Sequence, residues 1–338
     1  MWLQFRPVLA LFFLSLGQYL SAAPVNALDA DSTLRDDLVT KARVFQDQGY
    51  RTQAIALLQQ ADQLAKQLSE DSSETGLLLA QLYFELGEYP LSLNLITRTL
   101  DQSESKAIEA RALNILASVQ SILNDVKTAT DTFARAYTAS LASGDQAMTL
   151  TVLTNHLRHE LDNKNANKSL AIGKQLLTLS STLGVRSDTV EIQISIGDLF
   201  IRIADQTGED NFYRQALSIL QQAETTAKNQ GQVRLQSYAI GHQGRLLINQ
   251  NKLEDGIQRL TTANFLANTR RAFESAYLWQ WQLARALRLQ GKTDDAISGY
   301  QTAIGTLEYV RTELINGSPF TFPQKVQPLF AELSDLLL

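Results

Sequence analysis

Residues 80–99 read A-Q-L-Y-F-E-L-G-E-Y-P-L-S-L-N-L-I-T-R-T, and the fold prediction starts from this stretch. Apolar residues recur with the period of a helix on both sides of Gly87. Glycine readily takes the left-handed conformation that ends a helix. Small residues stand at Ala80 and Ser92, where two antiparallel helices joined by a tight turn would cross and approach closely. The stretch therefore predicts a helical hairpin.

The same pattern recurs along the chain. A small residue that we term the anchor opens the second helix of each copy, and the anchors are Ala54, Ser92, Ala129, Ser169, Ala216, Gly256 and Ala296. Their intervals are 38, 37, 40, 47, 40 and 40 residues. The copy around Ser169 is degenerate. In the fifth copy we place Gly197 at the helix crossing, with residues 206–212 lengthening the turn. One hairpin cannot bury its apolar face alone, so the units must stack.

This pattern resembles the tetratricopeptide repeat (TPR) family over about residues 35–311. Ala80, Tyr83 and the Gly87-x-Tyr89 turn make the best-matching copy. The resemblance implies an all-α fold, a right-handed superhelical solenoid of about seven TPR-like hairpins. The period is nearer 38–40 residues than the usual 34, and the end-of-repeat proline is missing. A HEAT-like solenoid is the alternative, although its helices lack the Gly-x-Tyr turn and the ladder of alanines.

Residues 1–27 have the order of a secretory signal peptide. Arg6 precedes the apolar run Val8–Leu16, which is too short for a bilayer that needs roughly 20 residues. Small side chains at Val25 and Ala27 fit a signal peptidase, so we expect cleavage after Ala27. The mature protein would then be exported, periplasmic or extracellular, with no stable membrane span. An uncleaved anchor or a buried first helix is the alternative.

The composition excludes several kinds of chemistry. The chain has no Cys among 338 residues, which excludes disulfides, thiolate metal sites and cysteine nucleophiles. A net charge of −5 argues against a general nucleic-acid-binding surface. No phosphate-loop, dinucleotide-binding or esterase motif is present. We therefore expect no catalytic residues, no cofactor and no enzymatic activity.

His156 and His159 stand three residues apart in a predicted helix and could share a metal ion. No third ligand is evident, so the sequence favours histidines on a surface or in a groove, and we predict no metal site.

The first helices of such repeats usually line the concave face of the array. There the pattern places a set of basic, aromatic and amide side chains, which we predict to bind a partner: Arg202, Tyr238, Arg245, Asn249, Trp281, Arg285 and Arg288. Trp281 lies one helical turn before Arg285, and Arg288 lies almost one turn after it. Such a cluster fits an acidic or C-terminal peptide. The alternative is a solvated face with scattered arginines.

Residues 316–338 follow the array of residues 28–315 as a loop and a capping or junction helix. The strings Y-Q-x-A-I-x-x-L-E-x-V-R-x-E-L from Tyr300 and F-x-x-x-V-x-P-L-F-x-E-L-x-D-L-L-L from Phe322 resemble the junction between TPR repeats and a CHAT domain. That domain is a caspase-like fold of large exported bacterial proteins, and its His–Cys pair has no counterpart here. The helix either folds back onto the array or offers a docking edge.

Together these observations predict an exported, non-catalytic TPR scaffold that mediates protein–protein interaction. Its partner would be a protein or peptide, including a CHAT-type domain in cis or in trans. The alternative function is the recruiting N-terminal half of a CHAT protease-type protein whose catalytic domain lies outside this chain.

Overall fold

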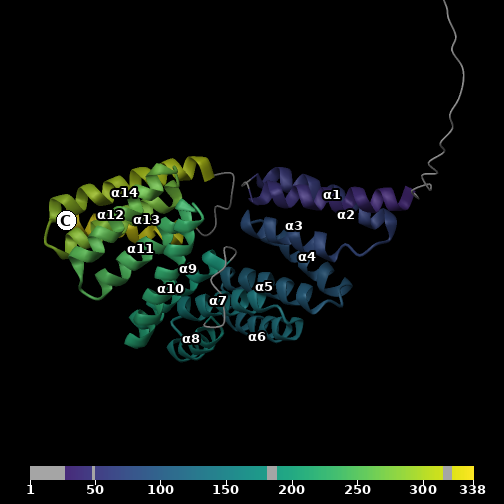
Figure 1. Ribbon diagram of the computed structural model, residues 1–338, viewed down its shortest axis with the longest axis horizontal. Helices are drawn as coiled ribbons and strands as arrows, with labels where there is room; N and C mark the ends of the chain where they lie inside the picture. The colour runs from purple at the N-terminus through teal and green to yellow at the C-terminus, as the bar shows by residue number, and fades with distance from the viewer. Residues whose placement is uncertain (1–26, 48–49, 181–188, 315–321) are drawn as a thin grey trace, which may run out of the picture.

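The computed structural model describes residues 27–47, 50–180, 189–314 and 322–338, and these ranges form fifteen α-helices and no strand (Figure 1). The first fourteen make seven antiparallel hairpins. Their first helices are α1 (Ala27–Asp47), α3 (Ser73–Glu85), α5 (Lys106–Ile122), α7 (Gln146–Asp162), α9 (Val190–Thr207), α11 (Val233–Asn249) and α13 (Phe273–Leu289). Their second helices are α2 (Arg51–Leu68), α4 (Tyr89–Gln102), α6 (Val126–Ser143), α8 (Ala166–Ser180), α10 (Asp210–Asn229), α12 (Leu253–Thr269) and α14 (Thr293–Leu314). The last helix is α15 (Phe322–Leu337). The predicted all-α array of seven hairpins is confirmed.

The signal-peptide prediction falls on residues 1–26, which lie outside the described residues. Ala27 is the first residue of α1. Export and cleavage after Ala27 therefore stay predictions, as does the domain boundary at residue 315. No helix in the described part of the chain is long and apolar enough to cross a membrane.

The anchors stand where the sequence pattern put them. In six hairpins the anchor is the fourth residue of the second helix, and all seven anchors are buried. The hydroxyl of Ser92 donates to the carbonyl oxygen of Ala80 at 2.7 Å, which brings the two predicted crossing residues together. A Cβ atom on Gly244 would lie 3.0 Å from the carbonyl oxygen of the anchor Gly256. Small residues thus let the two backbones of a hairpin approach closely.

The turns inside the hairpins use the predicted left-handed cap. The residue five before the anchor has a positive φ at Gly87, Asn124, Asn251 and Gly291, with values of 76°, 65°, 60° and 76°. Lys164 fills this position in the degenerate fourth copy with φ 56°. Glycine and asparagine tolerate this conformation at little cost, which explains their recurrence.

The fifth hairpin departs from the prediction. Residues 206–212 do not form a long turn, because α9 runs to Thr207 and α10 begins at Asp210. The added residues extend the helices, since a helix satisfies its backbone hydrogen bonds internally and a long loop does not. Gly197 packs directly beneath Leu220, as expected for a crossing residue, and a Cβ on it would lie 2.6 Å from the Leu220 Cγ.

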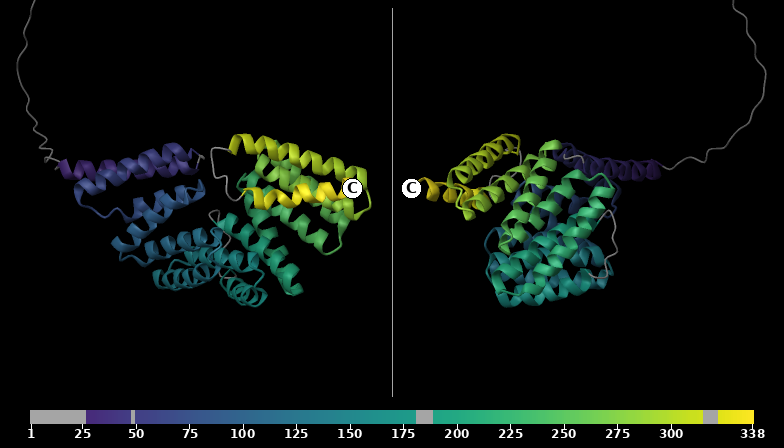
Figure 2. Two further views of the ribbon diagram at one scale, coloured as in Figure 1. Left: turned by 180° about the vertical axis from the view of Figure 1, so that it is seen from behind. Right: turned by 60° about the vertical axis from the view of Figure 1, so that its left-hand side comes forward.

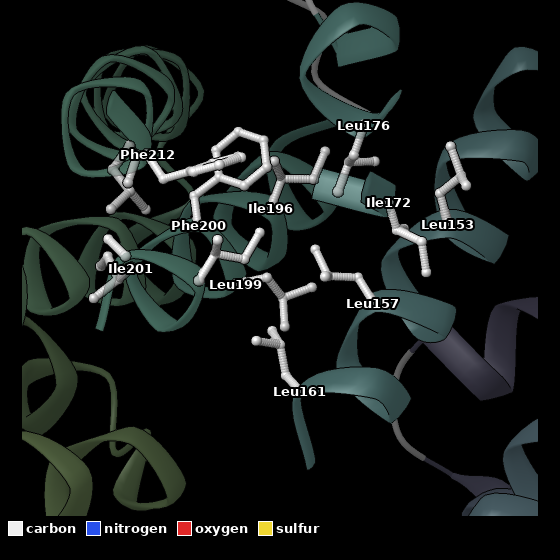
Figure 3. Packing of buried hydrophobic residues seen from close by; sticks show 14 of the residues in the cluster. Leu153, Leu157, Leu161, Ile172, Leu176, Ile196, Leu199, Phe200, Ile201 and Phe212 are labelled. Atoms are coloured by element: carbon white, nitrogen blue, oxygen red, sulfur yellow. The ribbon is translucent and has the colours of Figure 1, made fainter. Parts of the chain in front are cut away.

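The hairpins stack in an arc with two layers. From α3 onward, the first helix of each hairpin contacts the first helix of the next, while each second helix packs on its own partner and on the following first helix. The first helices therefore form the inner layer, and α6 and α8 lie on the outer side of the bend (Figures 1 and 2). In the middle of the arc, leucines of α7 meet Ile196, Leu199 and Phe200 of α9 in one apolar core (Figure 3).

The C-terminal helix α15 folds back onto the seventh hairpin. Val326 and Leu329 are buried against Tyr300, Ala303 and Leu307 of α14. The tail therefore folds back onto the array, which is one of the two arrangements expected for it. Its other side leaves Phe330, Leu337 and Leu338 exposed.

Candidate functional site

All seven residues predicted to bind a partner lie on first helices of the inner layer. Arg202 is on α9; Tyr238, Arg245 and Asn249 are on α11; Trp281, Arg285 and Arg288 are on α13. The structure does not bring them into one site. It divides six of them into a set of polar contacts between helices, an aromatic cluster and a carboxylate-binding group, and leaves Arg288 exposed.

Neighbouring first helices are joined by ion pairs that we term the inner ladder: Arg111–Glu74, Arg202–Asp162 and Arg245–Asp198. Their closest nitrogen–oxygen distances are 3.0, 2.5 and 2.6 Å. Asn249 adds hydrogen bonds to both carboxylate oxygens of Asp205 at 2.9 and 3.0 Å. Arg202, Arg245 and Asn249 are therefore held in fixed positions by acids of the preceding repeat.

Asp198 is the acid at the middle of this ladder. Burial alone would raise the pKa of Asp198, but Arg245 and His242 hold it well below the usual range. The His242 Nδ1 atom lies 3.2 Å from the same carboxylate. The carboxylate therefore stays ionised between α9 and α11, and the ion pair fixes the spacing of the two helices.

Tyr238 belongs to an aromatic cluster between α11 and α13. Its ring meets Trp279 edge to face at 5.8 Å and stacks with His242 at 6.4 Å. Trp279 is 2% exposed and donates its indole N–H to the Ser237 hydroxyl at 3.0 Å. Burial raises the pKa of Tyr238 to about 12. Tyr238 thus packs the inner layer.

Trp281, Arg285 and Tyr300 form the third group, which we term the carboxylate clamp. All three donate to Glu332 of α15: the Trp281 indole at 2.9 Å, the Arg285 Nε at 2.8 Å and the Tyr300 hydroxyl at 2.9 Å, each to Oε2. Arg285 also donates from Nη2 to Oε1, which makes the pair bidentate. Arg288, further along α13, is exposed.

The clamp is preorganised for a negative charge. The guanidinium carbon of Arg285 lies 4.3 Å from the centre of the Trp281 ring, a cation–π contact that orients the arginine. Burial would raise the pKa of Glu332, yet the hydrogen bonds from Arg285 and Trp281 lower it below the ordinary value. Burial and the bond to Glu332 raise the pKa of Tyr300 to about 12, so its hydroxyl stays a donor.

The two histidines considered as a metal pair have protein partners. His156 stacks on Phe133 at 5.3 Å, and burial lowers its pKa to about 4. The Nδ1 of His159 lies 2.7 Å from the Ser121 hydroxyl. The described residues contain no group of three His, Asp or Glu side chains placed to hold a metal ion.

The sequence predicted the arginines of the inner surface and did not predict the acidic residues that bind them. The spacing could have identified these acids, because each lies about one repeat from its arginine in the sequence. Asp162 precedes Arg202 by 40 residues, Asp198 precedes Arg245 by 47, and Glu332 follows Arg285 by 47.

No protein-family model and no curated protein sequence matches this chain. Solved structures do. A Rap protein complexed with competence and sporulation factor is 15% identical with a TM-score of 0.59, and the match covers 91% of this chain and 90% of that protein. RapI in its apo form is 14% identical with a TM-score of 0.58, over 82% of this chain and 99% of RapI.

A third structure is a signal-transduction ATPase with a tetratricopeptide repeat sensor from Pyrococcus horikoshii. It is 14% identical with a TM-score of 0.55, and the match covers 93% of this chain and 53% of that protein. At these identities the likeness concerns the fold. The class of the protein is an all-helical repeat array. More particularly, it is a TPR-like solenoid with a folded-back C-terminal helix.

Proposed function

We propose that this protein is an exported, non-catalytic TPR scaffold that binds a segment of a partner protein along its inner layer. One observation carries the proposal: the arginines of that layer are partly exposed and held in fixed positions by acids. The side chains of Arg202, Arg245 and Arg285 are 28%, 21% and 37% exposed. Donors fixed before binding lose little side-chain entropy when a partner arrives. Two of the similar Rap structures are described as complexes, one with a Phr* peptide and one with competence and sporulation factor.

The test is selection of binding peptides from a displayed random library, followed by hydrogen exchange of the complex. We expect protection on α7, α9, α11 and α13, which face the inside of the arc. Protection confined to α6, α8, α10 and α12, or no enriched peptide, would contradict the proposal.

A matched pair of variants sharpens this test. Arg158 on α7 donates to Asn155 of its own helix at 2.7 Å, and its charge also interacts with the ladder acids Asp162 and Asp198. The affinity of Arg158→Ala is therefore compared only after urea denaturation has shown that its free energy of unfolding equals that of the wild type. We expect Arg158→Ala to weaken a selected peptide by about tenfold, the effect of one lost charged hydrogen bond. Arg214→Ala on the outer helix α10 is the control, and its affinity should equal that of the wild type.

Export is part of the same proposal and rests on the signal-peptide order of residues 1–27. The test is the intact mass of the protein recovered from its source cells. Cleavage after Ala27 leaves 338 − 27 = 311 residues, or about 34 kDa at roughly 110 Da per residue. A mass that retains the first 27 residues would contradict cleavage.

A second candidate is the recruiting half of a CHAT protease-type protein, acting in cis or in trans. The side of α15 facing away from the array supports it, because Phe330 is 39% and Leu337 61% exposed. A native mass much larger than 37.5 kDa would favour this candidate. A mass of about 34 kDa would leave only the form in trans.

A further inference from the structure

Glu332 binds the seventh hairpin through an ion pair between inner helices, as in the inner ladder but with the order reversed. In each ladder pair the acid lies on the earlier helix, whereas Glu332 lies on the helix after Arg285. The same reversed order joins two first helices elsewhere, where Arg234 of α11 pairs with Glu274 of α13 at 2.6 Å. The separation of Arg285 and Glu332, 47 residues, equals that of Asp198 and Arg245. Helix α15 therefore stands where the first helix of an eighth hairpin would stand.

The seventh hairpin builds the clamp without help from α15. Trp281 and Arg285 come from α13, and Tyr300 comes from α14. Trp281 is 7% exposed and Tyr300 is fully buried, so both donors need an acceptor within the fold. Leaving such donors unsatisfied costs about 1–3 kcal/mol each. The clamp thus calls for a carboxylate, and it does not require that the carboxylate belong to this chain.

The apolar residues around Glu332 define what else a ligand must carry. Val326 and Leu329 lie six and three residues before the acid, and Leu333 and Leu336 lie one and four residues after it. All four pack against the cluster that contains Trp281, Tyr300 and Leu307. The helix that fits the clamp and the apolar surface around it is therefore amphipathic, with one acid inside its apolar stripe.

The way α15 is held makes it replaceable. Helix α9 is packed between α7 and α8 on one side and α10 and α11 on the other. Among the described residues, the packing of α15 is on the seventh hairpin, through α14 and the bond to α13. The Arg285 and Glu332 side chains are 37% and 21% exposed, so a competing carboxylate can reach the pair.

We propose that the carboxylate clamp is a docking site for an amphipathic helix of a partner protein, and that α15 occupies it in cis as a competitor. The partner helix places an acid against Trp281, Arg285 and Tyr300 and its apolar stripe where Val326, Leu329 and Leu333 lie. The inference rests on the proposed scaffold function and names the surface and the chemistry of the partner.

The experiment uses a fluorescent peptide with the sequence of residues 322–338 as the probe, added to the full chain. Glu332→Gln in the full chain weakens the competitor while keeping its shape. We expect this variant to bind the probe at least about tenfold more tightly than the wild type. Adding Arg285→Ala should abolish that gain, and adding Arg270→Ala, at an exposed position outside the clamp, should preserve it. A probe with Gln in place of the acid should bind at least about tenfold more weakly.

Two outcomes would overturn the proposal: equal probe affinity for wild type and Glu332→Gln, or unchanged probe binding when Arg285→Ala is added to Glu332→Gln. If Glu332→Gln loses helical signal, Leu329→Ala replaces it as the weakened competitor, with the same expectations. If the wild type is a dimer and Arg285→Ala makes it a monomer, the helix that binds the clamp is α15 of a second copy and not a partner protein. If selected peptides protect α7 to α11 from exchange but do not bind at the clamp, the scaffold function is supported and the clamp is not its docking site.

Discussion

The inner ladder between α9 and α11 and the carboxylate clamp between α13 and α15 use the same pair of groups in different settings. In both, an arginine of a first helix binds a carboxylate of the adjacent inner helix, at 2.6 Å for Arg245 and Asp198 and at 2.8 Å from the Nε of Arg285 to Glu332. The difference lies in the helix that carries the acid. Asp198 belongs to a helix that contacts the hairpins on both of its sides, whereas Glu332 belongs to a helix that packs on the seventh hairpin at the end of the described array.

This comparison separates a structural ion pair from an exchangeable one. Breaking the pair at Asp198 requires two hairpins to separate, so the whole array resists it. Breaking the pair at Glu332 requires one helix to leave an edge. Local opening is easiest where few contacts must be lost. The same chemistry therefore holds the array together in the middle and offers a replaceable contact at the end.

The largest expected effect is at the middle of the ladder. Asp198→Asn removes the charge that faces Arg245 and His242 and should lower the free energy of unfolding by about 3 kcal/mol, because the arginine stays partly buried without its partner. Urea denaturation measures it. Asp131→Asn, at an exposed position on α6, is the control and should change stability by less than about 0.5 kcal/mol. Equal effects for the two variants would refute a structural role for the ladder.

A second variant tests the close approach of the two helices within one hairpin, α11 and α12. Gly244→Ala places a Cβ 2.7 Å from the Leu260 Cγ and 3.0 Å from backbone atoms of α12. The backbone must shift, and overpacking of this kind costs about 2 kcal/mol. Gly305→Ala is the matched control, because nothing lies within 4 Å of its Cβ and alanine favours a helix. Thermal unfolding should show a lower midpoint for the first variant and an unchanged or higher one for the second.

A smaller effect is expected at the clamp. Glu332→Gln should cost about 1–2 kcal/mol, the value of a charge-assisted hydrogen-bond set at a partly exposed edge. The loss should appear as faster amide exchange in α15, with α9 and α11 unchanged. Faster exchange across all helices would mean that α15 unfolds only with the array.

The smallest effect concerns pH. The folded pKa of Glu332 is depressed, so the clamp contributes full stability above the unfolded value of about 4.3 and loses it as the pH falls through the folded pKa. A tryptophan fluorescence titration from pH 6 downward should show a transition below the ordinary glutamate pKa in the wild type. That transition should be missing in Glu332→Gln, and its persistence in the variant would contradict this origin.

The fold could be predicted from the sequence because its cause is local. Small residues such as Ala80 and Ser92 mark a helix crossing, and Gly87 marks the turn between, all within one short stretch. The fifth hairpin escaped this reasoning because added residues can extend either a turn or a helix, and the spacing alone does not distinguish the two.

The site was predicted only in part. The helical pattern identified Trp281 and Arg285 as inner-surface residues, and both are in the clamp. The pattern did not predict the hydrogen-bond acceptor of these two side chains, because contacts between repeats depend on how one hairpin is rotated relative to the next. The sequence pattern assigns Glu332 no role, because a single acid between the apolar residues Phe330 and Leu333 belongs to no repeat or charge motif.

The central claim is that α15 is a replaceable occupant of the seventh hairpin. Native-state hydrogen exchange of the wild-type chain tests it most directly, by comparing amides of α15 with those of α11. We predict that α15 opens at least about tenfold more often, without unfolding of the array. Exchange of both helices at the same rate would show that α15 is an integral part of the fold, and would contradict the claim.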